Sequence, residues 1–331
     1  MATERLTRRR ALGLLAAAAG LPLALRASRA TAEVVTWRGR ALGAPATLVL
    51  HHPDRAAAER LLAACAAELS RLEAIFSLYR ADSALSELNR NGALAAPPRE
   101  LVAILEDCRR YHAATSGAFD PTVQPVWRLY ASHFATGGPP EGPPPSALAE
   151  ARARIGLDAV RVSPDRIAFA RPGMALTLNG VAQGWITDRI IDLLRSAGVT
   201  STLVDLGEIR ALGDNAGTPW RAGIAQGDTI LPLIDRAVAT SSPAGFCFDP
   251  AAHFGHILDP RTGLSVSAFA SQVIVTAATA ADADALSTAL VFVEPMLAAK
   301  VLRKVPGAAI AHVCSGTGEK MFENMRSKRV V

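Results

Sequence analysis

Residues 271–290 read SQVIVTAATAADADALSTAL and combine the two patterns on which the fold depends. The first part, 272–277, is a short apolar run rich in β-branched residues, which is typical of a buried strand. The second part is apolar on almost every side and predicts a buried helix over 280–292. A buried strand leading directly into a buried helix indicates that both pack against one core.

Similar helices and strands alternate along the rest of the chain. Apolar residues at helical spacing predict helices over 56–77, 101–115 and 185–197. A polar loop and a short helix precede Asn91-Gly92, and the Pro/Gly-rich stretch 135–146 predicts an exposed insertion or hinge. Strand-like segments are expected in four further places, at 34–50, within 158–180, at 202–206 and at 308–313. Because many connections look like hairpins, we expect an α+β fold with mixed or antiparallel sheets and packed helices.

The first 32 residues have the features of an export signal. Arg8, Arg9 and Arg10 precede an apolar run over 11–25, and small residues follow at 30–32. The arginine pair resembles a twin-arginine signal, although Ala11 and Gly13 replace the usual Phe and Lys. The alternative is a membrane anchor, but this run is shorter than the about 20 residues that span a bilayer. We therefore expect a twin-arginine-type signal over 1–32, a periplasmic domain over 33–331 and no permanent membrane anchor.

The charge of the chain is concentrated in this same segment. The chain has 35 Lys and Arg against 30 Asp and Glu, and residues 1–32 hold six of the Arg and one of the Glu. The remainder therefore carries 29 basic and 29 acidic residues. A neutral domain gives no electrostatic argument for a nucleic-acid partner, and we expect none.

Four cysteines, at 65, 108, 247 and 314, are widely separated and form no CxxC pair. This spacing argues against a metal cluster. Two of them could pair in an oxidising compartment, but their apolar neighbours favour buried free thiols.

The predicted helix at 280–292 contains acidic residues that an apolar helix does not need. Thr279 and Asp282 have the spacing of a capping box, in which both side chains satisfy N–H groups of the first turn. Asp284 and Thr288 lie one turn apart on one face. A buried carboxylate and a hydroxyl suit a hard cation such as Mg²⁺ or Ca²⁺. Alternatively, Asp284 joins the cap or pairs with an arginine from elsewhere.

Three other stretches could contribute to a site. Glycines at 180 and 184 precede a helix, which either lets backbone N–H groups approach a phosphate or makes an ordinary strand-to-helix turn. Within residues 116–127, SGAFDPTVQPVW, Phe119-Asp120-Pro121 is expected to form a rigid turn, which turn chemistry alone explains. In GHILDPRTG, 255–263, His256 is either an acid or base or a capped loop residue.

Taken in order, five blocks of the sequence resemble the ApbE family of FAD:protein FMN transferases. The blocks are IFSLYRADSALSELN, TSGAFDPTVQPVW, LNGVAQGWITDRIIDLLRSAGV with TLVDLGEIRALG, VATSS with HILDPRTG, and ADALSTAL, which together span about 75–290. The resemblance implies a single α+β domain, related to the T-fold, that binds FAD and Mg²⁺. This domain would occupy residues 33–331.

The resemblance also assigns roles to individual residues. It implies that Mg²⁺ is held by the Gly180 carbonyl, Asp284 and Thr288. The FAD contacts that it implies are Leu42, Tyr79, Ala118, Phe119, Asp120, Thr177, Gln183 and Leu258. The chain departs from the usual family pattern at several positions, namely Leu42 for Met, Thr177 for Asp, Gln183 for Lys, Gly207-Glu208 for Gly-Gly, and Ser242-Pro243 where a Tyr commonly follows Thr-Ser-Gly.

The activity that the resemblance implies is Mg²⁺-dependent transfer of FMN from FAD, with release of AMP. The acceptor would be a Thr or Ser hydroxyl in the flavinylation motif of an exported or membrane-associated redox protein. His256 or Asp259 would accept the proton of that hydroxyl. Two alternatives remain open, a metal-dependent FAD pyrophosphatase that makes FMN and AMP, and a non-catalytic periplasmic flavin-binding protein.

Overall fold

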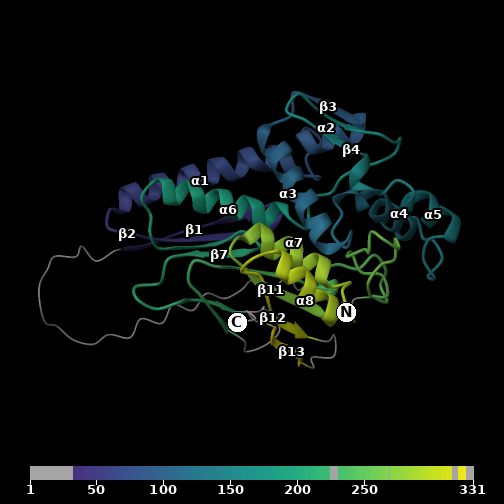
Figure 1. The fold of residues 1–331 in the computed structure, drawn as a ribbon. Helices are drawn as coiled ribbons and strands as arrows, with labels where there is room; N and C mark the ends of the chain where they lie inside the picture. The colour runs from purple at the N-terminus through teal and green to yellow at the C-terminus, as the bar shows by residue number, and fades with distance from the viewer. Residues whose placement is uncertain (1–32, 224–229, 268, 315–319, 326–331) are drawn as a thin grey trace, which may run out of the picture.

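An eight-stranded antiparallel sheet organises the computed structural model, which describes residues 33–223, 230–267, 269–314 and 320–325 (Figure 1). Its strand order is β1-β2-β6-β7-β10-β11-β12-β13, and every neighbouring pair is antiparallel. The strands are β1 (Glu33–Ala41), β2 (Ala44–His52), β6 (Thr202–Asp205), β7 (Ile209–Leu212), β10 (Ala237–Ser241), β11 (Gln272–Ala277), β12 (Ala309–Cys314) and β13 (Lys320–Met325). The predicted α+β class with antiparallel sheets and packed helices is confirmed.

Two smaller sheets and a set of helices complete the described chain. The smaller sheets are β3-β5-β4, from Ala93–Ala95, Arg166–Phe169 and Val160–Val162, and the hairpin of β8 (Trp220–Gly223) with β9 (Ile230–Leu233). The helices are α1 (Arg55–Phe76), α2 (Ala84–Asn91), α3 (Arg99–Thr115), α4 (Gln124–Ala135), α5 (Pro145–Arg152), α6 (Ala182–Ser196), α7 (Ala280–Leu290) and α8 (Pro295–Lys304). Short 3-10 turns lie at Pro121–Val123, Leu157–Ala159 and Pro243–Gly245.

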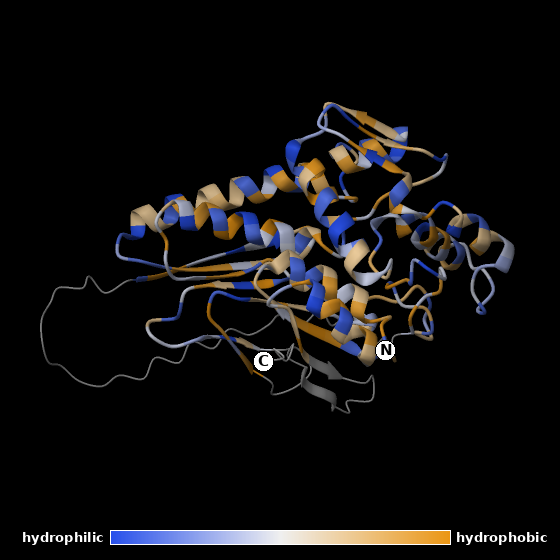
Figure 2. Cartoon of the chain, viewed as in Figure 1, coloured by the Kyte–Doolittle hydropathy of each residue, from blue (hydrophilic) through white to orange (hydrophobic). Residues whose placement is uncertain are grey.

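Alternation along the strands separates the core into layers on the two faces of the large sheet. Val204 joins the core under α1 and α6, whereas its neighbour Leu203 packs with Trp220 of the β8–β9 hairpin. Likewise, Val273 and Val275 pack with α7 and α8, while Ile274 faces the opposite side. Figure 1 shows α1 and α6 running side by side along the sheet, and Figure 2 shows hydrophobic residues concentrated on the strands beneath them.

The strand-like stretch at 34–50 is a hairpin. β1 and β2 pair along their whole lengths, from Glu33 opposite His52 to Ala41 opposite Ala44. The two residues between them, Leu42 and Gly43, both have positive φ, at 47° and 84°. A two-residue turn needs this left-handed conformation, which Gly adopts freely and Leu adopts at a cost. The turn therefore places Leu42 at the end of the hairpin.

The sequence analysis did not predict helix α4. Its first two residues are Gln124 and Pro125, and the 3-10 turn before it begins at Pro121. These prolines resemble loop signals, but proline is well accommodated in the first turn of a helix because the N–H it lacks has no partner there. The predicted insertion at 135–146 connects α4 to α5. Within it, Gly142 is buried because the ring of Phe254 packs against it.

Helix α7 is buried as predicted, but its acidic residues are used differently from the expected capping box. The Thr279 hydroxyl accepts the Asp282 N–H at 3.1 Å, so this half of the box is confirmed. The predicted role of the Asp282 carboxylate is wrong. It accepts hydrogen bonds from the Arg110 guanidinium and the Tyr111 hydroxyl, at 3.0 and 2.9 Å. Helix α3 brings these donors against α7, and the N–H groups at the start of α7 are taken instead by Asp188.

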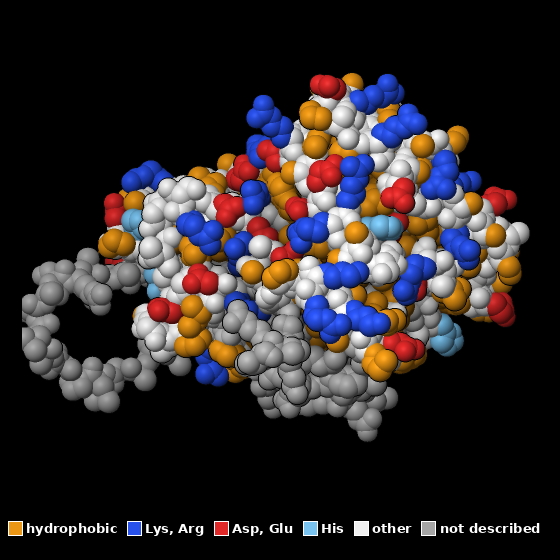
Figure 3. Space-filling model, in the orientation of Figure 1, with side chains coloured by type: hydrophobic (Ala, Val, Ile, Leu, Met, Phe, Trp, Pro, Cys, Tyr) orange, Lys and Arg blue, Asp and Glu red, His pale blue; other side chains and the backbone are white. Residues whose placement is uncertain are grey.

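The cysteines are free thiols where the structure describes them. Cys65 and Cys108 are buried and Cys247 is partly buried. The side chain of the fourth cysteine and the predicted signal segment, 1–32, lie outside the described residues. Of the described helices, none combines the length and apolar character needed to cross a membrane. On the face drawn in Figure 3, acidic and basic side chains are interspersed.

Candidate active site

A cavity of about 1210 Å³ opens between helices α6 and α7, strand β10 and the loops around 118–127 and 244–260. Twelve of the thirteen site residues predicted from the sequence line it. They are Leu42, Tyr79, Ala118, Phe119, Asp120, Thr177, Gly180, Gln183, His256, Leu258, Asp284 and Thr288. The structure thus brings together residues that are up to 246 positions apart in the chain, from Leu42 to Thr288. The cavity has a polar end and an aromatic end.

The polar end is built on the contact between α6 and α7. One carboxylate oxygen of Asp284 accepts the backbone N–H of Gly184 at 3.1 Å. The helices approach closely here, because a Cβ on Gly184 would lie 2.3 Å from the Ala280 carbonyl oxygen. Only glycine permits this approach, and it places the start of α6 directly against the carboxylate. The glycine that resembled part of a phosphate loop therefore serves helix packing.

Thr288 lies one turn further along α7 and meets two other segments of the chain. Its hydroxyl is 3.2 Å from the Ser241 hydroxyl, which is also 2.8 Å from that of Ser287. Gly180 is adjacent, because a Cβ on it would come within 3.1 Å of the Thr288 hydroxyl oxygen. Helix α7, the turn before α6 and the end of β10 therefore converge at this point of the cavity.

These residues suit a hard divalent cation. A carboxylate, a hydroxyl and a backbone carbonyl are oxygen ligands of the kind that Mg²⁺ and Ca²⁺ prefer. Burial raises the pKa of Asp284 to about 7, so the charged carboxylate is poorly solvated and would gain from a cation. Among the described residues, no three His, Cys, Asp or Glu side chains form a group that could hold a metal. An ion here would therefore depend on the hydroxyl and the carbonyl as well as on Asp284.

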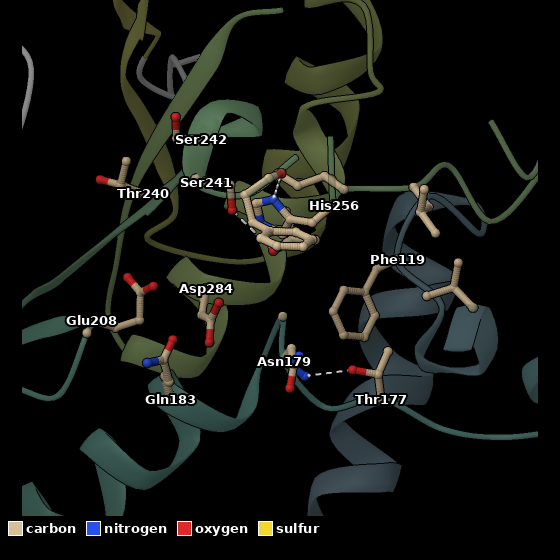
Figure 4. Close-up of a pocket in the computed structure, with 18 of the residues that line it drawn as sticks. Phe119, Thr177, Asn179, Gln183, Glu208, Thr240, Ser241, Ser242, His256 and Asp284 are labelled. Atoms are coloured by element: carbon tan, nitrogen blue, oxygen red, sulfur yellow. Dashed lines mark hydrogen bonds between the residues drawn. The ribbon is translucent and has the colours of Figure 1, made fainter. Parts of the chain in front are cut away.

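Glu208 is a second buried acid at the polar end, and the sequence analysis did not include it in the site. It lines the cavity with Gln183 and Asp284, and Figure 4 shows the three on one side. Burial, together with the nearby charge of Asp284, raises its pKa well above the usual range. The sequence showed only that an acid replaces a family glycine, and it carried no signal that the side chain faces Asp284.

The aromatic end of the cavity is made by residues of α4 and the loop after β10. Trp127 and Phe246 are stacked, with ring centroids 6.5 Å apart and planes at 25°. Both line the cavity, as does Phe119 from the loop after α3. Flat rings of this kind can pack against a planar heterocycle. Trp127 lies within a quoted block, but neither it nor Phe246 was predicted as a site residue, because only folding brings their rings together.

His256 also lines the cavity, and Figure 4 shows it beside Ser241. Its Nδ1 is 3.0 Å from the Phe246 carbonyl oxygen. Since a carbonyl can only accept, Nδ1 carries the proton and Nε2 is the basic nitrogen. Asp259, the other predicted base, is placed differently. Arg261 binds both of its carboxylate oxygens, at 2.9 and 2.7 Å, and Asp259 is not among the residues that line the cavity.

Two predicted FAD contacts differ in how free their side chains are. The buried Asp120 accepts the Thr122 N–H at 2.8 Å and the Leu157 N–H at 3.3 Å, so its carboxylate holds the loop in shape. Tyr79, in contrast, is 76% exposed at the edge of the cavity, where its ring is available to a ligand.

Comparisons with known proteins identify the family of the chain. The model of the ApbE family matches residues 42–311. The chain is 29% identical over 301 residues to the FAD:protein FMN transferase of Haemophilus influenzae, covering 84% of this chain and 85% of that protein. It is 30% identical to the FAD:protein FMN transferase of Treponema pallidum, covering 72% of this chain and 73% of that one.

A solved structure shows the same fold. The apo form of the flavinyl transferase ApbE from Pseudomonas stutzeri matches with a TM-score of 0.75 and 27% identity, over 90% of this chain and 95% of that one. The family match covers most of the chain, including every predicted site residue. The chain belongs to the ApbE family.

Proposed function

We propose that this protein transfers FMN from FAD to a Thr or Ser hydroxyl of an acceptor protein and releases AMP. Its relatives are named FAD:protein FMN transferases, and the chain is accordingly a flavin transferase. The observation that carries the finer proposal is one cavity that combines an oxygen-ligand set, an aromatic wall and a histidine with a defined basic nitrogen.

In this reaction the acceptor hydroxyl oxygen replaces the bridging pyrophosphate oxygen on the FMN phosphorus. The acceptor hydroxyl oxygen forms a bond to the FMN phosphorus, and the bond from that phosphorus to the bridging oxygen breaks. AMP leaves with the electron pair of that bond. The hydroxyl proton passes to His256 Nε2, the ring orientation being fixed by the hydrogen bond from Nδ1 to Phe246.

Asp284, Thr288 and the Gly180 carbonyl would hold Mg²⁺, which when bound neutralises negative charge on the pyrophosphate. Trp127, Phe246 and Phe119 would pack against the rings of FAD, at the other end of the cavity. The exposed ring of Tyr79 would add to this contact. The two ends thus have separate tasks, since one manages phosphate charge and the other positions a heterocycle.

The acceptor is expected to be an exported or membrane-associated redox protein with a Thr/Ser flavinylation motif. This part of the proposal, like the periplasmic location, is supported by the twin-arginine-type pattern in residues 1–32. Fusion of 1–32 to a reporter that functions only after twin-arginine export tests the location. Replacement of Arg8 and Arg9 by Lys should then abolish export.

The activity is tested by incubating the domain over 33–331 with FAD and Mg²⁺, with and without an acceptor carrying the motif. Transfer predicts AMP together with covalent, fluorescent flavin on the acceptor. AMP without labelling would identify an FAD pyrophosphatase, and neither product would identify a flavin-binding protein.

Two variants separate the candidate bases. His256→Gln should lower the rate by about 10²–10⁴-fold, the usual contribution of a general base. Asp259→Asn should cost far less, because Arg261 already binds that carboxylate away from the cavity lining. The reverse order would assign the proton transfer to Asp259.

A further inference from the structure

We propose that Asp188, which lies outside the cavity lining, is a positioning residue that fixes helix α7 so that Asp284 and Thr288 face the bound cation. This inference rests on the proposed metal role of those two residues. It concerns a contact between two helices that the sequence analysis did not anticipate.

Asp188 projects from α6 onto the first turn of α7. Its two carboxylate oxygens accept the backbone N–H groups of Ala280 and Ala281, at 2.8 and 3.0 Å. Arg210, on strand β7, forms an ion pair with the same carboxylate. The Asp188 residue is 5% exposed, so this junction of α6, α7 and β7 is closed to solvent.

This arrangement is a helix cap supplied by another helix. The first N–H groups of a helix have no partner within it and are normally satisfied by the residue just before it. Here Thr279 serves only the Asp282 N–H, and Asp188 takes the two N–H groups before it. A carboxylate at this end also interacts favourably with the helix dipole. Asp188 therefore satisfies the first N–H groups of α7 and also attaches the start of α7 to α6.

The spacing of the contacts between α6 and α7 restricts how α7 can move. On α6, Gly184 and Asp188 are four residues apart, and on α7, Ala280 and Asp284 are four residues apart. The N–H of Gly184 reaches Asp284, and Asp188 reaches the N–H of Ala280. Two contacts one turn apart on each helix restrict both sliding and rotation of α7. Loss of the Asp188 contact would leave the Asp284 carboxylate held by its Gly184 bond alone at this junction.

Substitution of the charge tests the positioning role. Asp188→Asn keeps the size of the side chain and one oxygen acceptor. Its NH₂ group replaces the second oxygen, however, and cannot accept a hydrogen bond from a backbone N–H. Binding of Mn²⁺ alone, in the absence of FAD, is measured by electron paramagnetic resonance on the full chain. We expect an affinity about 10–100-fold weaker than that of the unsubstituted protein, as for other groups that orient metal ligands.

Two controls separate positioning from general stability. Asp192→Asn, one turn further along α6, removes an exposed ion-paired acid and should leave Mn²⁺ binding unchanged. Ile104→Val, at a buried position of α3, should lower the thermal midpoint without changing any side chain of the junction, and it should also leave Mn²⁺ binding unchanged. If Asp188→Asn binds Mn²⁺ as well as these controls do, the inference is wrong.

A double variant covers the case in which Asp188→Asn alone folds poorly. In Asp188→Asn the Arg210 guanidinium loses its carboxylate partner, and Arg210→Gln then removes that unpaired cation. The thermal midpoint of the double variant should therefore recover, while its Mn²⁺ affinity remains weak. Recovery of both would assign a purely structural role to the pair. Failure of the underlying metal site has a different signature, since the unsubstituted protein itself would then bind no Mn²⁺ and Asp284→Asn would change nothing.

Discussion

The two ends of the cavity are built by different means. At the polar end, Asp284 and Thr288 project from a buried helix that the backbone of α6 and the Asp188 carboxylate hold in place. At the aromatic end, the rings of Trp127 and Phe246 meet from a helix and a loop, and Phe246 remains 47% exposed. One end is fixed by glycine, hydrogen bonds and charge, and the other by the packing of rings.

This difference corresponds to what each end would have to do. Oxygen ligands of a small cation must be held to within a fraction of an ångström, which favours a site on packed helices. A planar ring system tolerates sliding over aromatic faces, so a partly exposed loop is adequate. Variants at the polar end should therefore have large effects on chemistry or folding, and those at the aromatic end should have modest effects on binding.

Among variants at the two ends of the cavity, the largest effect is expected for Asp284→Asn. The variant keeps an oxygen for the Gly184 N–H but loses the charge that would bind the cation. Metal stabilisation of charge is worth several kcal/mol, so Mg²⁺-dependent AMP release should fall about a thousandfold. The thermal midpoint should not fall, because a poorly solvated carboxylate has been removed. Full metal-dependent turnover in this variant would show that Asp284 is not the ligand.

The next effect concerns the approach of α6 to α7. In Gly184→Ala the new Cβ would lie 2.3 Å from a backbone oxygen, so the helices must move apart. Overpacking of this kind should lower the free energy of unfolding by about 1–3 kcal/mol, measured by denaturant titration. Gly223→Ala is the matched control, because a Cβ there meets no atom within 4 Å. Equal stability of the two variants would contradict the close approach.

A smaller effect should appear on changing pH. Burial raises the pKa of Asp284 to about 7, and protons therefore compete with the cation below that value. Apparent Mg²⁺ affinity, measured calorimetrically, should rise about tenfold from pH 6 to pH 8 and level off above it. A carboxylate with an ordinary pKa would give a flat profile over this range. Asp284→Asn should remove the dependence together with the binding.

The smallest effect is predicted at the aromatic end. Phe246→Ala removes one ring of the stacked pair, and such contacts are worth about 0.5–1.5 kcal/mol. The KM for FAD should therefore rise roughly two- to tenfold while kcat changes little. Phe269→Ala removes an exposed ring that is not among the cavity residues and should change neither parameter. A large loss of kcat in Phe246→Ala would mean that this wall also aligns the reacting phosphate.

Local features of the molecule follow from residue spacing alone. The spacing of Asp284 and Thr288 places them on one face of α7, and alternation along 272–277 places Ile274 opposite Val273 and Val275. These patterns depend only on helix and strand geometry, which repeats within a few residues. The resemblance to the family, which rests on five blocks in order along the chain, added twelve of the residues that line the cavity.

Which distant groups complete the site depends on how the whole chain folds. Asp282, which was predicted to cap α7, binds Arg110 instead, and Asp188 accepts N–H groups at the start of α7. The stacking of Trp127 on Phe246 likewise follows from folding. A buried polar group takes whatever partner packing brings to it, and the strength of charged and multiple hydrogen bonds outweighs a local preference. Such choices are made between segments far apart in the chain, where residue spacing carries no information.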